Sequence, residues 1–400
     1  MASRKTPLTL SPIAAAETPI YQLASVFQRD LFFPDPAPLY ALAGALVANL
    51  HQGHPVWLML LGSPSCGKSL LLNSLLSING IHDASEINGT PALLSGVKRR
   101  DIAGDSKGGL LNDIGTHGGL VIEEFTSVLS MSQEKLQTLL AALRSIYYGR
   151  WSRNIGTEGG RKITWEGKLA LFGGCTNVLD RYTQVSADMG ERWIYYRFPE
   201  TTGWAESNKI LSRITDPSKI KQELCSGMLD FLSNLELDWN QNPEFRKLKR
   251  WEIDRLISVS QFSARARSSV PRDPRTLEIL DAAIPEAPMR LANTLGQLYL
   301  GLEVAGLDSN ESWRTIRKTA LDCVPFLRVQ VISAIQAGYK TVADIADKAR
   351  TSPGAARRGI EDLCLHGVVE ARPGVQGYRL TSWTDQVWGD AGFSLGESGA

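Results

Sequence analysis

The sequence predicts an α/β fold built around a parallel sheet, and three observations support this prediction. Short apolar runs of buried-strand length occupy residues 56–61, 118–122 and 168–173. Stretches with helical patterning separate these runs, an alternation that is typical of parallel sheets covered by helices. Glycine and polar residues follow the runs directly, at the strand ends where ligands bind in such sheets.

The first apolar run leads into a glycine loop. Residues 62–69 match the pattern G-x-x-x-x-G-K-S/T at every fixed position, and an apolar helical stretch follows. Such a loop turns backbone N–H groups toward phosphate oxygens, and the helix N-terminus adds partial positive charge. We expect Lys68 to reach the β- and γ-phosphates of a nucleotide and the Ser69 hydroxyl to hold Mg²⁺. The residues expected to contact the nucleotide are Gly62, Ser63, Pro64, Ser65, Cys66, Gly67, Lys68, Ser69 and Leu70.

The later apolar runs adjoin residues that suit hydrolysis. Glu123 and Glu124 end the second run, and we expect the first to hold Mg²⁺ and the second to polarise the attacking water. Asn177 follows the third run and is placed to orient that water, with Thr176 as its competitor. Arg192 precedes a further apolar run and is either an ordinary surface arginine or a group that reaches the γ-phosphate of a neighbouring subunit. The N-K-x-D pattern of GTP-specific sites is incomplete, so ATP is the expected nucleotide.

The composition is that of a globular chain with several domains. Of its 400 residues 43% are hydrophobic and 21% are charged, and the formal net charge is +1. Because the charges balance, any nucleic-acid surface must be local. The five cysteines are scattered without C-x-x-C spacing, which argues against a disulfide framework or zinc site and favours the cytoplasm. No apolar run has membrane-spanning length, so no membrane partner is expected.

Pattern changes along the chain predict five segments. We expect a lead-in at 1–34, an α/β core at 35–200, a helical lid at 201–325, a small C-terminal domain at 326–383 and a flexible tail at 384–400. The polar residues 268–274 interrupt the helical pattern of the lid.

Residues 144–168 carry features of nucleic-acid binding. Most of this stretch reads as a β-hairpin, and it holds six basic residues against two acids, with four aromatic residues between them. Cations and aromatic rings together suit phosphate contacts and base stacking. The alternative is a hairpin whose rings pack on the core and whose charges are solvated. The DNA contacts expected here are Arg150, Arg153, Arg161 and Lys162.

The C-terminal segment is a second candidate for DNA binding. Its pattern predicts helices at 326–338, 341–346 and 354–366 and then a small hairpin, the order of a winged helix-turn-helix. That fold places its third helix in the major groove, although winged helices also dock proteins, and the sequence leaves this alternative open. The DNA contacts expected here are Arg357, Arg358, Arg372 and Arg379.

Taken in order, these motifs resemble an AAA+ ATPase. The series is the glycine loop, an apolar strand ending in two glutamates, a hairpin of Y-x-G-x-W type, a strand ending in T-N, and G-E-R-W-x-x-Y-R-F. It is most similar to the branch with a hairpin inserted into the second helix and another before sensor 1. That branch holds the minichromosome-maintenance (MCM) helicases and their phage and mobile-element relatives. The resemblance covers about residues 35–325.

The resemblance also implies roles for single residues. It implies Walker B roles for Glu123 and Glu124, a sensor 1 role for Asn177, and an arginine-finger role in trans for Arg192. The lid should supply a sensor 2 arginine. Our choice is Arg290, with Arg275 in reserve. The chain departs from the family in opening Walker B with Glu instead of Asp, and we expect no oligonucleotide-binding domain ahead of the ATPase.

The combined expectation is an ATP-driven DNA motor, either an MCM-like helicase or a DNA remodeller. It would act as an oligomeric ring, with a hexamer as the expected state. The alternative is an ATP-gated DNA-binding initiator or loader switch, which would hydrolyse slowly and hold ATP. A transcription activator of the AAA+ type ranks lower, because the G-A-F-T-G-A loop of that class is not found.

Overall fold

A computed structural model describes residues 18–30, 35–85, 87–95, 108–155, 161–182, 192–199, 217–273, 275–281, 284–372, 374 and 376–393. Within these ranges five parallel strands form the central sheet, in the order β2-β3-β6-β1-β7. The strands are β1 (Trp57–Leu61), β2 (Ile81–Asp83), β3 (His117–Ile122), β6 (Lys168–Cys175) and β7 (Trp193–Arg197). The predicted α/β class with a parallel sheet is confirmed, and the predicted strand runs coincide with β1, β3 and β6.

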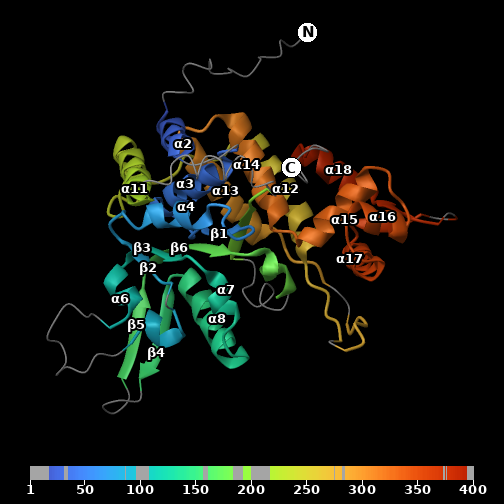
Figure 1. Cartoon of the computed structure of the whole chain (residues 1–400), viewed down its shortest axis with the longest axis horizontal. Helices are drawn as coiled ribbons and strands as arrows, with labels where there is room; N and C mark the ends of the chain where they lie inside the picture. Colours follow the sequence, from blue (N-terminus) through green and yellow to red (C-terminus); the bar gives the residue numbers. More distant parts are fainter. Residues whose placement is uncertain are drawn as a thin grey trace, which may run out of the picture.

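The two faces of the sheet bury separate cores. Leu58 and Leu60 of β1 pack into one core, whereas Met59 and Leu61 pack into the other, as the alternation of side chains along a strand requires. Figure 1 shows the sheet between a large helical layer and a smaller one. The large layer contains α2 (Pro19–Asp30), α3 (Ala37–Leu50), α4 (Lys68–Leu75), α11 (Pro217–Asn234), α12 (Arg250–Arg267), α13 (Met289–Val304) and α14 (Ser309–Asp322). The smaller layer contains α5 (Thr90–Leu93), α6 (Leu110–Ile114), α7 (Phe125–Leu129) and α8 (Gln133–Tyr147).

Helix α3 lies between the sheet and α13, and all of its residues are buried. An apolar sequence all round the helix suits this position. The approach to α13 is close, since a Cβ on Gly301 would lie 2.3 Å from the carbonyl oxygen of Gly44. The predicted lead-in needs correction, because α2 forms within it and buries Ile20 and Phe27 in the core. Residues 1–17 lie outside the described residues.

The smaller layer is extended by a two-stranded antiparallel hairpin of β4 (Arg150–Ile155) and β5 (Arg161–Glu166). It projects from the sheet beside α8 (Figure 1). The hairpin predicted at this place is therefore present. The described part of the lid, from residue 217, is helical as expected, with breaks between its helices at 235–249, 268–288 and 305–308.

The C-terminal segment folds against the lid. Its elements are α15 (Phe326–Gln336), α16 (Val342–Lys348), α17 (Pro353–Leu365), β8 (Val369–Ala371), β9 (Tyr378–Leu380) and α18 (Ser382–Ala391). The order of three helices and a hairpin agrees with the sequence pattern. The flexible tail predicted from residue 384 is wrong as far as residue 391, because α18 packs on α12, where the Trp388 and Phe262 rings lie 5.0 Å apart. Arg328 adds bonds from α15 to the carbonyls of Ala266 and Ser268.

No helix in the described part of the chain combines the length and the apolar character needed to cross a membrane.

Candidate nucleotide-binding site

The glycine loop joins β1 to α4 at the carboxyl edge of the sheet. Ser65 and Gly67 have φ angles of 65° and 97°, so the chain turns tightly, as in loops whose successive N–H groups bind anions. Gly62 leaves no space for a side chain, since a Cβ there would lie 2.8 Å from Cys66 Sγ and 3.0 Å from Phe198 Cβ. The first N–H groups of α4 have no helical carbonyl one turn earlier, so they are donors for an anion.

Lys68 folds back over the loop. Its Nζ donates to the carbonyl of Gly62 at 3.0 Å and of Ser63 at 2.8 Å, and the residue is only 7% exposed. The ammonium group is thus held within the curve of the loop. Ser69 and Leu70 follow on exposed positions of α4. A loop with a turned backbone, a helix N-terminus and a central cation fits a phosphate chain.

The two predicted acids lie beside this loop. Glu123 is half-buried, and its Oε2 accepts a bond from Asn73 Nδ2 at 3.2 Å. Asn73 lies one turn after Ser69 on α4, so the residue that contacts Glu123 shares a helix face with Ser69. Glu124 is exposed, and its Oε1 accepts a bond from the N–H of Thr126 at 3.2 Å, which caps α7.

A hydroxyl next to a carboxylate suits Mg²⁺, which keeps several oxygen ligands from phosphates and water. Ser69 and Glu123 are the two residues of this chain that would hold it. Within the described ranges no three His, Cys, Asp or Glu side chains gather as a metal site of protein ligands alone would need.

Cys175 connects the two halves of the site. It ends β6, lies in register with Leu61 of β1, and is buried. Burial raises the pKa of its thiol, the charge of Glu124 raises it further, and the charge of Lys68 lowers it. Lys68 and Glu124 therefore both affect the Cys175 thiol. They follow β1 and β3, which lie on opposite sides of β6 and are not adjacent in the sheet.

Asn177 lies at the same edge, two residues after Cys175. It is exposed and begins the 3-10 turn η2 (Asn177–Arg181), with the partly exposed Thr176 before it. The turn is fixed by Asp180, which receives two bonds of 2.7 and 2.9 Å from Arg197 at the end of β7. Burial by itself would lower the pKa of Arg197, but the pair with Asp180 raises it.

The sequence analysis missed this clamp of Arg197 and Asp180. Arg197 ends one apolar run and Asp180 comes shortly after another, and this pattern indicated that both lie near strand ends. Their spacing alone could not show that they meet.

Arg192 lies at the opposite edge of the sheet. β7 runs parallel to β1 with Trp57 opposite Trp193, so Arg192 precedes the strand at its amino end. Five strand residues span about 17 Å, which separates Arg192 from the glycine loop of its own chain. Its side chain is nearly buried, with the guanidinium over the rings of Tyr147 and Tyr148 at 5.6 and 5.1 Å from their centroids.

Arg290 lies with Arg192 and not with the loop. Its Nη2 donates to Tyr148 Oη at 3.2 Å. Burial lowers the pKa of Arg192, and the nearby charge of Arg290 lowers it further. Arg290, the expected sensor 2 arginine, therefore lies away from the glycine loop of its own chain. Arg275, the reserve choice, is exposed in the segment 268–288 between α12 and α13.

The basic residues of the β4–β5 hairpin face a groove. Arg150, Arg153 and Lys162 line a hollow of about 760 Å³ between the hairpin and α8, together with hydroxyl-bearing residues of α8. Arg150 pairs with Glu166 at 3.1 Å, and Arg153 donates to the carbonyl of Leu94 at 3.0 Å. The side chain of Arg161 lies outside the described residues.

Two of the four aromatic residues of this hairpin region follow the alternative in which the rings pack on the core. Trp165 and Tyr147 are buried, and Trp165 Nε1 donates to the carbonyl of Gly115 at 2.6 Å. These two rings pack on the core and are not available to stack on bases. Trp151 is partly buried, and Tyr148 is exposed but lies beside Arg192.

The C-terminal arginines form a separate basic region. Arg357 is exposed and Arg358 partly exposed on α17, while Arg372 follows β8. Arg379 of β9 pairs with Glu370 of β8 at 2.8 Å.

Comparisons with known proteins add no assignment to this geometry. The chain matches no model of a protein family, and no curated protein matches it either.

Proposed function

We propose that this chain is an ATP-hydrolysing DNA motor of the AAA+ type. The observation that carries the proposal is the meeting of Lys68, the Glu123–Glu124 pair and Asn177 at one edge of the sheet, with β6 between β1 and β3. The glycine loop follows β1 on one side of β6 and the acids follow β3 on the other, and in this proposal a nucleotide lies between them.

Each residue has a separate task in this proposal. The loop N–H groups and Lys68 bind the phosphates and stabilise the charge that develops on them. Ser69 and Glu123 would hold Mg²⁺, which would supply positive charge to offset that of the phosphates. Glu124 accepts the proton of the attacking water, and Asn177 orients that water, with its turn held by the Arg197–Asp180 clamp.

In this proposal a neighbouring subunit supplies the cation for the far side of the γ-phosphate, and the position of two arginines suggests which residues these are. Arg192 and Arg290 lie together at the amino edge, which their own loop cannot reach. We propose that they act together on the loop of a neighbouring subunit in a ring. In this proposal Arg290 keeps its expected role as the sensor 2 arginine and exerts it on the nucleotide of the neighbour.

DNA would bind along the groove of the β4–β5 hairpin and on the C-terminal segment, which we propose to be a winged helix. The buried Trp165 and Tyr147 favour contacts with phosphates over base stacking at the hairpin. Bonds from α15 and packing of α18 tie the C-terminal segment to the lid, so a movement of the lid on nucleotide turnover would carry this segment along.

Steady-state ATP hydrolysis with and without single- and double-stranded DNA tests the proposal. We expect DNA to stimulate hydrolysis, and Glu124→Gln to lower the rate at least about 100-fold, because the variant keeps the cap on α7 but loses the base. Glu134→Gln, on an exposed glutamate in the first turn of α8, is the control and should leave the rate unchanged.

Slow hydrolysis that ignores DNA, with ATP still bound, would contradict the motor and favour the initiator or loader switch. Absence of ATP binding would contradict both.

A further inference from the structure

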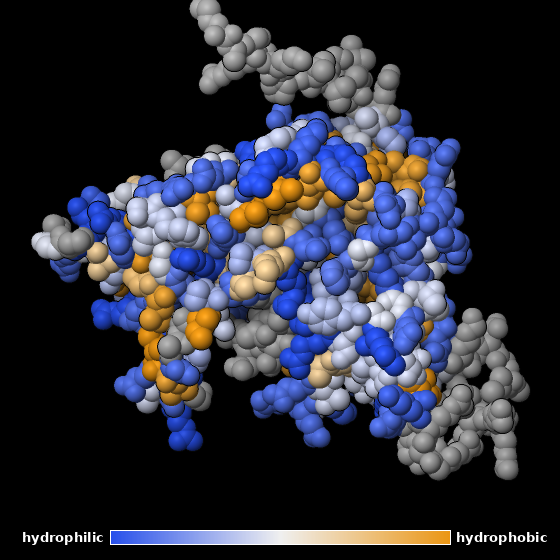
Figure 2. Space-filling model, turned by 180° about the vertical axis from the view of Figure 1, so that it is seen from behind, coloured by the Kyte–Doolittle hydropathy of each residue, from blue (hydrophilic) through white to orange (hydrophobic). Residues whose placement is uncertain are grey.

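The lid carries a small hairpin between α12 and α13. We name it the lid hairpin and define it by its two arms, residues 271–273 and 275–280. An antiparallel bridge joins Arg272 to Ile279, and further backbone bonds connect the two arms. The hairpin projects from the lid beside α17 in Figure 1, and Figure 2 shows the same projection from behind, at the lower left. Its backbone bonds give this projection a defined shape.

One side chain ties the lid hairpin to α17. The Arg272 guanidinium pairs with Asp362 at 2.6 Å and with Glu361 at 3.2 Å, and its side chain is 15% exposed. The same guanidinium donates to the carbonyl of Leu277 at 2.9 Å, so it connects both arms to the helix. Asp362 is also paired with Arg328 at 2.9 Å. The lid hairpin is therefore anchored to the C-terminal segment by charge-assisted hydrogen bonds.

The two acids that anchor the hairpin share the sides of α17 that carry its arginines. Arg357 and Glu361 are four residues apart, and so are Arg358 and Asp362. Each acid therefore lies one helical turn, about 5.4 Å, after an arginine on the same side of the helix. Arg357 is exposed and Arg358 is partly exposed. Arg272 thus contacts α17 one turn away from two residues that we expect to contact DNA.

A DNA duplex on this side of α17 would need the space that the lid hairpin occupies. The major groove is about 12 Å wide, and an α-helix with its side chains is about 10–12 Å across, so a helix nearly fills the groove. Two more arms of chain, attached to the same side of the helix one turn away, do not fit in the groove beside it. DNA that approaches this side must therefore displace the hairpin.

We propose that the lid hairpin is an autoinhibitory cover, which must leave α17 before this helix can enter the major groove of duplex DNA. This inference rests on the proposed function, because it requires the C-terminal segment to bind DNA as a winged helix. Release of the hairpin separates Arg272 from Glu361, whereas Asp362 keeps Arg328 as its partner. The affinity for DNA is then reduced by the fraction of molecules that are covered.

Fluorescence anisotropy with a labelled DNA duplex of mixed sequence tests this proposal. Arg272→Gln/Glu361→Gln removes the anchor together with one charge of each sign, so the net charge stays the same. We expect this variant to bind the duplex at least about threefold more tightly than the wild type, because fewer molecules are covered. Arg275→Gln/Glu278→Gln is the matched control. It also removes one charge of each sign, from exposed positions of the same hairpin, and should bind like the wild type.

Hydrogen exchange followed by mass spectrometry tests the movement in the wild type, without a substitution. With saturating duplex the amides of the lid hairpin should exchange faster, because the bonds between its arms lose the support of the Arg272 anchor. Unchanged or slower exchange would overturn the inference. Equal or weaker binding by the anchor variant would overturn it too, and would leave the DNA-binding role of the C-terminal segment intact. If neither the wild type nor the anchor variant binds the duplex, that role fails together with the cover.

Discussion

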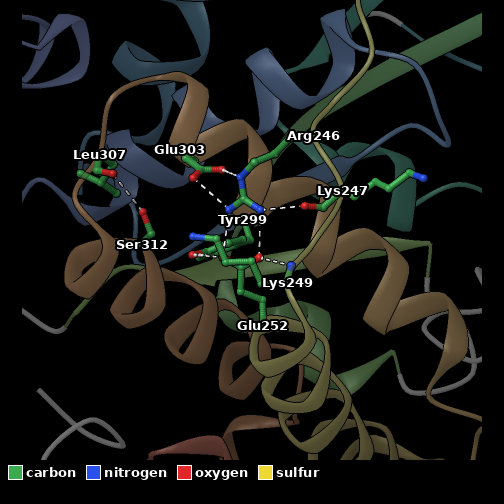
Figure 3. Close-up of polar contacts among 8 residues, drawn as sticks. All are labelled: Arg246, Lys247, Lys249, Glu252, Tyr299, Glu303, Leu307 and Ser312. Atoms are coloured by element: carbon green, nitrogen blue, oxygen red, sulfur yellow. Dashed lines mark hydrogen bonds and ion pairs between the residues drawn. The ribbon is translucent and has the colours of Figure 1, made fainter. Parts of the chain in front are cut away.

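Arg246 offers a quantitative test of how the lid is held. It binds the fully buried Glu252 through Nη1 and Nη2 at 3.0 and 2.9 Å, and Glu303 through Nε at 2.7 Å (Figure 3). Arg246→Met would leave the carboxylate of Glu252 without its cation, which costs roughly 3–5 kcal/mol. Glu252 keeps bonds from the N–H of Lys249 at 2.7 Å and from Tyr299 Oη at 3.3 Å. We therefore expect a loss at the low end of this range, a decrease of about 3 kcal/mol in the free energy of unfolding.

Urea unfolding followed by fluorescence measures this loss as a shift of the midpoint by about 1 M, for a slope of about 3 kcal/mol/M. The double variant Arg246→Met/Glu252→Gln removes both charges and should recover most of the loss. Arg250→Met, which breaks an exposed pair with Asp254, should change stability by less than about 0.5 kcal/mol. If Arg246→Met were as mild as Arg250→Met, the buried pair would not be holding the lid.

Three further predictions concern pH, the 3-10 turn and DNA. Burial lowers the pKa of Lys168 to about 7, so between pH 7 and 10.5 the unfolded chain holds a proton that the folded chain lacks. The free energy of unfolding should then rise with pH in that window by up to about 1.4 kcal/mol per unit, and Lys168→Met should remove this rise in urea titrations. Asp180→Asn should lower kcat for ATP about tenfold with little change in ATP affinity, because it loosens the turn that carries Asn177; an unchanged kcat would reject that role. Lys162→Ala should weaken DNA binding and reduce the slope of log affinity against log salt by about 1, whereas an unchanged slope would place DNA elsewhere.

Local patterns were sufficient to predict that the central residues of the candidate site lie at one edge of the sheet. The glycine loop, the two glutamates and Asn177 each follow an apolar run, and the strands of a parallel sheet all end at one edge. For that reason the sequence could place these residues together without knowing the order of the strands. The hairpin and the helices of the C-terminal segment were also visible as local patterns.

Features that depend on packing between distant segments of the chain could not be predicted from local sequence patterns. Arg290 begins a helix whose position is set by its packing along α3, and this brings it to the amino edge beside Arg192. The sequence left open whether Trp165 of the hairpin is exposed or packed on the core, and in the fold its indole is buried against Gly115. Residues 384–400 were predicted to be a flexible tail because they are rich in Gly and Ser, but Trp388 packs on α12.

Mixing two inactive variants tests the central claim most directly. Arg192→Ala keeps its own loop and Glu124 but lacks the arginine for its neighbour, whereas Glu124→Gln keeps the arginine but lacks the base. If Arg192 completes the site of the next subunit, the mixture should hydrolyse ATP several-fold faster than the sum of the two variants measured separately. If the mixture shows only that sum at every ratio, or if Arg192→Ala alone hydrolyses like the wild type, the site is not completed by a neighbour.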